Sequence, residues 1–213
     1  GSAVLVETAS ARQLARIQHK DAVITIAFSP DGKYFATGSE DGNAVLVETA
    51  SARQLARIQH DGYIQDIAFS PDGKYFATGS DDGSALLVET ASGRELNRIQ
   101  HNDIITGIAF SPDSRYFATG CGDGSAVLVE TASARQLARI QHDGNVQDIA
   151  FSPDGKYFAT AGGHSVYLLP ISRETLIEKV CDRLTRNLTP EEWEKYIGKA
   201  LPYHPSCPNL PAP

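Results

Sequence analysis

A heptapeptide that recurs at a fixed interval constrains this chain more than any other feature. Ile-Ala-Phe-Ser-Pro-Asp-Gly begins at Ile26, Ile67 and Ile149, and a variant that ends in Ser begins at Ile108. Neighbouring copies lie 41 residues apart. Self-similarity at a period of about 20–50 residues is typical of solenoids and propellers. We therefore expect a fold built from repeated copies of one small unit.

Each unit reads as four short strands separated by turn sequences. In the second unit, strand-like runs cover residues 64–69, 75–78, 85–88 and 95–100, and no helical period lies between them. Four such strands describe one blade of a β-propeller, and one blade cannot bury both of its faces alone. The sequence predicts an all-β propeller of four-stranded blades.

The unit resembles the WD-repeat family. His60 to Glu89 follow the family's order: a His, a first strand, Ser-Pro-Asp-Gly, a second strand, an Asp turn and a third strand. Gln59 replaces the family's Gly before the His, and Val88-Glu89 replace its Trp-Asp pair. The resemblance covers roughly residues 3–169 and implies WD-like blades.

The resemblance also implies a structural hydrogen-bond network in each blade, without the family's Trp. Its expected members are His19, Thr37, Asp41, His60, Thr78, Asp82, His101, Thr119, Asp123, His142 and Thr160. In the last unit the turn Gly162-Gly163-His164 is one residue short and has no Asp. The resemblance therefore supplies no complete network there, and we expect Gly163 to tolerate substitution better than Asp82.

The repeats divide the chain into a propeller region, 1–170, and a tail, 171–213. The propeller region comprises third and fourth strands at 1–19, followed by units 20–60, 61–101, 102–142 and 143–170. Gly1–His19 are identical to Gly124–His142. The last unit meets Pro170 after its third strand, and proline ends strand pairing. The chain thus has a spare fourth strand at one end and lacks one at the other.

Complementary ends suggest how a ring could close, because an uncovered strand edge invites pairing. The chain holds four blade equivalents, and WD-repeat proteins usually build seven or eight blades. We favour a homodimer of eight blades, in which each N-terminal strand completes the partner's last blade. A closed four-bladed monomer is the alternative. The additional N-terminal third strand fits neither arrangement neatly.

The tail has a different pattern. Ser172 can cap a helix that ends near Arg186, and Thr189-Pro190-Glu191-Glu192 forms a capping box for a second helix. Residues 201–213 are rich in proline and read as an extended strap. We expect the tail to cover the last blade. It resembles the segment that ends many bacterial WD-repeat proteins, often ones with upstream signalling modules.

The cysteines and histidines do not form a metal-binding pattern. Cys121 stands where other units have Ser and reads as incidental. For Cys181 and Cys207 we favour reduced thiols over a disulfide, and over a metal site with His204, because the spacing matches no zinc motif. The repeated His residues recur at every blade junction and read as structural. We predict no metal and no cofactor.

Composition and charge exclude several classes of function. The net charge of −7, from 26 acidic and 19 basic side chains, argues against nucleic-acid binding. No signal segment or membrane-spanning apolar run is present, so we expect a cytoplasmic protein. No nucleophile, base and orienting group occur together, so we predict no enzymatic activity. The absence of methionine suggests that the chain is an excised or processed piece.

One stretch varies between units while the turns and second strands stay nearly constant. It follows each His, and its candidate partner-binding residues are Lys20, Asp21, Ala22, Tyr63, Gln65, Asn102, Ile104, Asn145 and Gln147. Tyr63 and Ile104 are the candidate apolar anchors. Drift at exposed loops explains the variation equally well.

These observations favour a non-enzymatic propeller that binds an unidentified protein or acts as a scaffold. Two alternatives stay open from the sequence. One is a structural, engineered or excised propeller fragment without a ligand of its own. The other is a sensor module of a larger signalling protein.

Overall fold

The computed structural model describes residues 1–172, 175, 181, 186–187, 189–192 and 207. The chain divides into two compact units, Gly1–Leu168 and Leu169–Pro213, which we describe separately. Among the described residues, no helix has the length and apolar character needed to cross a membrane.

The N-terminal compact unit, Gly1–Leu168, consists of strands joined by short turns. In chain order they are β1 (Ser2–Val6), β2 (Gln13–Gln18), β3 (Val23–Phe28), β4 (Tyr34–Ser39), β5 (Asn43–Glu48), β6 (Gln54–Gln59), β7 (Ile64–Phe69), β8 (Tyr75–Ser80), β9 (Ser84–Glu89), β10 (Arg94–Gln100), β11 (Ile105–Phe110), β12 (Tyr116–Cys121), β13 (Ser125–Glu130), β14 (Arg135–Gln141), β15 (Val146–Phe151), β16 (Tyr157–Gly162) and β17 (Ser165–Pro170).

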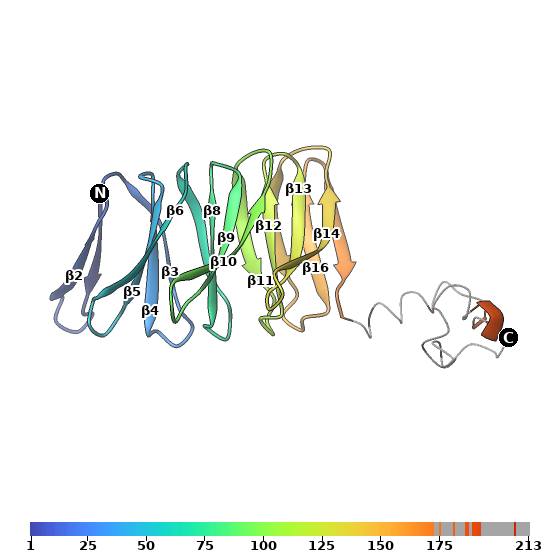
Figure 1. Ribbon diagram of the computed structural model, residues 1–213, viewed down its shortest axis with the longest axis horizontal. Coiled ribbons are helices and arrows are strands. Elements are labelled where there is room, and N and C mark those ends of the chain that lie inside the picture. Colours follow the sequence, from blue (N-terminus) through green and yellow to red (C-terminus); the bar gives the residue numbers. More distant parts are fainter. Residues whose placement is uncertain (173–174, 176–180, 182–185, 188, 193–206, 208–213) are drawn as a thin grey trace. The chain divides into compact units, whose positions relative to one another are not determined.

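The strands form five sheets that follow one another in chain order (Figure 1). Three of them, β3–β6, β7–β10 and β11–β14, contain four strands each, and the pairings described in them are antiparallel. The prediction of four-stranded blades is confirmed. The first sheet contains only β1 and β2, and the last contains β15, β16 and β17. The two partial sheets therefore stand at the ends of the row.

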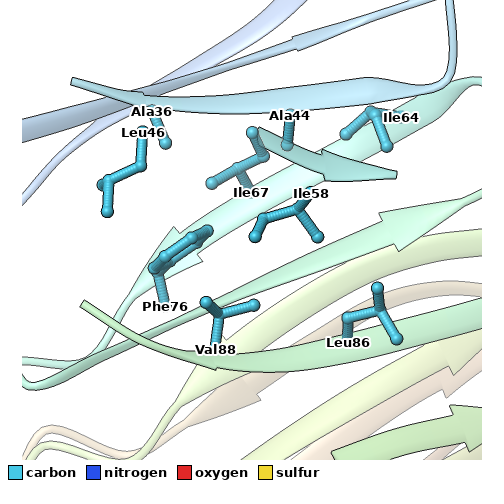
Figure 2. Close-up of a cluster of buried hydrophobic side chains, with 9 residues drawn as sticks. All are labelled: Ala36, Ala44, Leu46, Ile58, Ile64, Ile67, Phe76, Leu86 and Val88. Carbon is cyan, nitrogen blue, oxygen red and sulfur yellow. The ribbon is translucent and has the colours of Figure 1, made fainter. Parts of the chain in front are cut away.

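The core lies between successive sheets. Figure 2 shows one cluster, in which Leu46 and Ile58 of one sheet pack with Ile67, Phe76 and Val88 of the next. The second and third strands of each full sheet are covered on both faces, so they are apolar or small at nearly every position. An equivalent Phe is fully buried in the second strand of the later units, at Phe76, Phe117 and Phe158.

The Ser-Pro-Asp-Gly turns are closed by their own side chains. The Ser70 hydroxyl donates to Asp72 Oδ1 (2.7 Å), which also accepts the N–H of Lys74 (3.1 Å). Gly73 has a φ of +71°, a left-handed conformation that glycine adopts at little cost. The third unit has Ser114 at this position, with a φ of +62°. The Ser114 hydroxyl accepts the N–H of Asp72 in the neighbouring turn (3.0 Å), so it links two blades.

Apolar side chains are exposed at both ends of the row of sheets. Ile26 of β3 is 55% exposed, whereas its equivalents Ile67 and Ile108 are 5% and 8% exposed. The preceding sheet lacks its first two strands, which in other blades cover this surface. At the opposite end, Val166 and Leu168 of β17 are 71% and 63% exposed. Each end therefore displays a surface that is buried at the inner blade junctions.

In the C-terminal compact unit, Leu169–Pro213, the described residues form the predicted caps. The Thr175 N–H donates to Ser172 Oγ (3.0 Å). Thr189 and Glu192 exchange hydrogen bonds, Thr189 N–H to Glu192 Oε2 (2.9 Å) and Glu192 N–H to Thr189 Oγ1 (3.1 Å). This is the reciprocal capping box expected from the sequence. The proline-rich strap lies, apart from Cys207, outside the described residues.

The expectation of reduced thiols in the tail is wrong, because Cys181 and Cys207 form a disulfide. The Asn187 side chain holds the backbone of Cys207 through two hydrogen bonds of 3.0 Å, one to its N–H and one to its carbonyl. The two Cα atoms lie 5.4 Å apart, within the usual range for a disulfide. Disulfides persist mainly in oxidising compartments, so this bond weighs against the predicted cytoplasmic location, which stays a prediction.

Candidate functional site

A buried histidine precedes the first strand of each blade and contacts the second strand, and His60, His101 and His142 also contact a Ser of the third strand. His60 is 4% exposed, with Nε2 2.8 Å from Thr78 Oγ1 and Nδ1 2.9 Å from Ser84 Oγ. In the third unit, His101 makes the same two contacts with Thr119 and Ser125, each at 2.8 Å. The structure thus brings the sequence-predicted His and Thr residues together in successive blades.

Sequence reasoning missed the serine that joins this network. Ser84 donates its hydroxyl proton to Asp82 Oδ1 (2.6 Å), which leaves its lone pairs free for His60 Nδ1–H. In the first unit Asn43 replaces this serine, and His19 Nδ1 lies 3.3 Å from Asp41 Oδ2. The sequence does contain a pattern that could have revealed this serine: a Ser lies two residues after the turn Asp, at Ser84 and again at Ser125.

The aspartate of each network also anchors the loop that follows the histidine. Asp82 Oδ2 accepts the N–H of Asp61 (2.9 Å), and Oδ1 accepts the N–H of Ser84 (2.7 Å). Burial opposes ionisation of Asp82, but these bonds and the Ser84 hydroxyl outweigh it and lower the pKa of Asp82 to about 2. The carboxylate is therefore ionised, and it holds the loop that follows His60 against the turn that precedes β9.

The last blade keeps most of its network without an aspartate. His142 Nε2 lies 2.8 Å from Thr160 Oγ1, and Nδ1 lies 3.1 Å from both the Gly162 carbonyl and Ser165 Oγ. The structure does not compare Gly163 with Asp82, so that expectation stays a prediction. A Cβ at Gly163 would lie 2.0 Å from Asp143 Oδ1 and 2.9 Å from the Gly144 nitrogen, so a substitution there requires the shortened turn to shift.

One network contains three groups of the kind that bind metals. Ligand atoms of His101, Cys121 and Asp123 lie within 4.8 Å of one another. Cys121 Sγ donates to the Asp103 carbonyl (3.1 Å) and accepts the Asp123 N–H (3.3 Å), as the Ser39 hydroxyl does with its own neighbours. Burial raises the pKa of the Cys121 thiol to about 11, so it stays protonated. The cluster is therefore the structural network of this blade, with Cys121 in the position that Ser39 has in the first repeat.

The variable stretches lie together at the end of the strands where the histidines sit. All nine candidate partner-binding residues are exposed: Lys20, Asp21, Ala22, Tyr63, Gln65, Asn102, Ile104, Asn145 and Gln147. We call this surface the variable face. Tyr63 and Ile104 are 49% and 39% exposed. Their backbone carbonyls accept the N–H groups of Asp81 and Gly122, each at 2.9 Å, so the Asp turns hold both residues in place.

Acidification is expected to lower the melting temperature in two stages. Burial, reinforced by the charge of Arg139, lowers the pKa of His101 to about 4, and burial also lowers the pKa of His60. Below the unfolded-state value of about 6.5, the unfolded chain binds protons that the folded chain does not, so stability falls as the pH drops toward 4. Asp82 adds a second loss below about pH 4, since its folded pKa is the lower one. A constant melting temperature between about pH 7 and pH 4.5 would show that the histidines are not buried as neutral groups.

A comparison with models of known protein families identifies the repeats. The model of the family described as "WD domain, G-beta repeat" matches four times, at residues 12–47, 53–88, 93–129 and 135–168. A search of curated proteins found no match. The four matches cover most of the chain. Each begins with the fourth strand of one sheet and ends in the third strand of the next, so each spans one histidine network. The chain belongs to the WD40 repeat family.

Proposed function

We propose that this WD40 chain is a non-enzymatic protein-binding module that contacts its partner through the variable face. The observation that carries the proposal is a contrast within each blade. The histidines are 3–5% exposed and hydrogen-bonded, whereas all nine variable positions beside them are exposed. A rigid scaffold that presents variable loops is the arrangement that binding proteins commonly use.

Two exposed apolar side chains give this face its expected binding energy. Tyr63 and Ile104 lie at the starts of neighbouring blades, and the hydrogen bonds of their carbonyls fix the backbone before a partner arrives. Pre-organised residues lose less conformational entropy on binding. Aromatic and large apolar residues in such positions dominate the energy of many protein interfaces.

The test replaces both Tyr63 and Ile104 with Ser. Because neither side chain is in the core, we expect an unchanged melting temperature and at least about a hundredfold loss of affinity for a partner captured from the source cell. Leu137→Ser is the matched control, since Leu137 is also 39% exposed but lies on the outer strand β14. Unchanged affinity of the double variant would move the binding site away from this face.

We further propose that two copies of the 213-residue chain complete one eight-bladed ring. The surface around Ile26 and Phe28 is 52–55% exposed in the single chain, but Ile67, its inner equivalent, is 5% exposed. The first and second strands that would cover this surface are present, as β15 and β16, at the other end of the chain. A partner copy can therefore supply them head to tail.

In such a ring, β1 of one chain and β17 of the other would compete for the same position in the shared blade. A blade needs four strands, whereas β1 and β2 together with β15, β16 and β17 make five. Both β1 and β17 correspond to the third strand, so one of them must leave the shared blade. β2 then supplies the fourth strand that β17 lacks, and the exposed edge of the sheet is covered.

A further inference from the structure

One position of the repeat alternates between aspartate and other residues. It lies directly before the Ile of the heptapeptide, in the first strand of each unit. The residues at this position are Thr25, Asp66, Gly107 and Asp148. The first strands β3, β7, β11 and β15 contact one another in this order along the row of sheets. Each aspartate is therefore followed by a position without one, except at Asp148, where the row ends.

Asp66 binds the Ile N–H groups of two blades. Its Oδ1 accepts the N–H of Ile67, the next residue of its own strand (2.8 Å). Its Oδ2 accepts the N–H of Ile108 in the following blade (2.8 Å). Ile108 comes after Gly107, which has no side chain of its own to accept that N–H. One carboxylate thus pairs two backbone donors and joins two blades.

Asp148 makes only the first of these two bonds. Its Oδ1 accepts the N–H of Ile149 (2.8 Å), as Asp66 Oδ1 does for Ile67. Within the part of the chain that the structure describes, Asp148 Oδ2 accepts no hydrogen bond, and the residue is exposed. The oxygen that joins two blades at Asp66 is therefore available at Asp148.

The matching donor lies at the other end of the row. Ile26 of β3 is opposite Thr37 of β4, as Ile108 of β11 is opposite Thr119 of β12. Because the registers are the same, the Ile26 N–H points away from β4, as the Ile108 N–H points away from β12. No side chain among the described residues accepts the Ile26 N–H. The other three Ile N–H groups at this position each bind a carboxylate.

We propose that Asp148 binds a second copy of this chain, with Oδ2 accepting the N–H of Ile26 of that copy. The inference rests on the two-chain ring proposed above, and it assigns the polar contact at each junction between the chains. Asp66 and Ile108 are the template for this contact. In the ring, Asp148 is followed by Thr25 of the next chain, so the alternation continues without a break.

This contact selects one arrangement of the two apolar ends. A junction like the inner ones buries the Ile side chain, since Ile108 is 8% exposed whereas Ile26 is 55% exposed in the single chain. A backbone N–H buried there without an acceptor is costly. Apolar contact alone allows many orientations, but only the head-to-tail arrangement in this register brings the carboxylate to the N–H.

The test is Asp148→Asn in the full chain, with the dissociation constant of the two-chain complex measured by sedimentation over a dilution series. An amide has the shape of a carboxylate but a single oxygen, so it cannot accept both the Ile149 and the Ile26 N–H. Loss of a hydrogen bond to a charged group should weaken association about tenfold at each junction, or about a hundredfold for the ring. The Ile26 amide should also exchange its hydrogen slowly in the native complex and rapidly in the variant.

Two further variants separate this contact from a general disturbance of the strand. Asp66→Asn makes the same change at a junction inside the chain, so it should lower the melting temperature and change the dissociation constant by less than about twofold. Adding Thr25→Asp to Asp148→Asn should restore most of the native affinity, because the new carboxylate can accept the Ile26 N–H as Asp66 accepts that of Ile67. A pair of substitutions that stayed weak would contradict the proposal.

The outcomes also distinguish this contact from the ring itself. If the native chain forms the two-chain complex and Asp148→Asn associates with native affinity, the assignment of Asp148 is overturned and the ring stands. If the native chain is monomeric throughout the dilution series, the ring and the contact are overturned together.

Discussion

Replacing Ile26 with Asp is expected to convert a two-chain ring into a monomer of 22.9 kDa. In the single chain Ile26 is 55% exposed, so a carboxylate there is solvated and the fold is unaffected. In the ring the same position would be buried like Ile67, and a buried unpaired carboxylate costs several kcal/mol, about enough to abolish association. Light scattering at micromolar concentration should give twice the chain mass for the native protein and the chain mass for the variant.

A mixing experiment tests whether the two ends contact each other. Leu168→Asp alters the opposite end, where the native side chain is 63% exposed, and it should also give a monomer. A mixture of the two variants contains one unaltered end of each kind, so it should form a two-chain complex joined at a single junction. Leu137→Asp on the outer strand is the control and should leave the ring intact. A native chain that is monomeric would instead favour the four-bladed alternative.

Asp82→Ala is expected to reduce the free energy of unfolding by about 3 kcal/mol. The change removes three hydrogen bonds, from the Asp61 N–H, the Ser84 N–H and the Ser84 hydroxyl. It also removes the carboxylate oxygen that lies 3.4 Å from His60 Nδ1. The loss exceeds that of a single bond because Ser84 and His60 are buried, at 1% and 4% exposed, and lose a partner away from water. Denaturant unfolding followed by circular dichroism measures it.

The neighbouring residue provides the control for this measurement. Asp81 is in the same turn, and its side chain accepts a hydrogen bond from the exposed Gln65 side chain (2.7 Å). Asp81→Ala should therefore change stability by less than about 1 kcal/mol. If both variants lost the same amount, Asp82 would not be a structural centre of the blade.

Much of the blade could be predicted because its signals are local and repeated. The turn residues and apolar runs that define β7 recur in β11 and β15, so the repeats reinforce one another. The resemblance also placed His60, Thr78 and Asp82, since these positions are fixed by their distance from the turns. Exposure of Tyr63 follows from the same register, because it precedes the first buried residue of its strand.

What could not be predicted depends on contacts between distant segments or on backbone geometry. The disulfide joins residues 26 positions apart in the sequence, and the Asn187 side chain binds the backbone of Cys207, a contact that no local pattern shows. The close contact at Gly163 comes from the shortened turn, which brings the Gly144 nitrogen to 2.9 Å from an added Cβ. Thr90 reads in sequence as an ordinary turn residue, and only its burial reveals an unpaired hydroxyl.

The identity of Gly1–His19 and Gly124–His142 has a consequence for how the chain reaches its native state. The hairpins β1–β2 and β13–β14 have the same side chains, so during folding either can dock where the other belongs without any local penalty. Misassembly of this kind is a characteristic failure of repeat proteins, and it becomes more frequent when several chains are present. Refolding should therefore be slower and less complete as protein concentration rises, and the trapped species should contain well-formed blades joined in the wrong order.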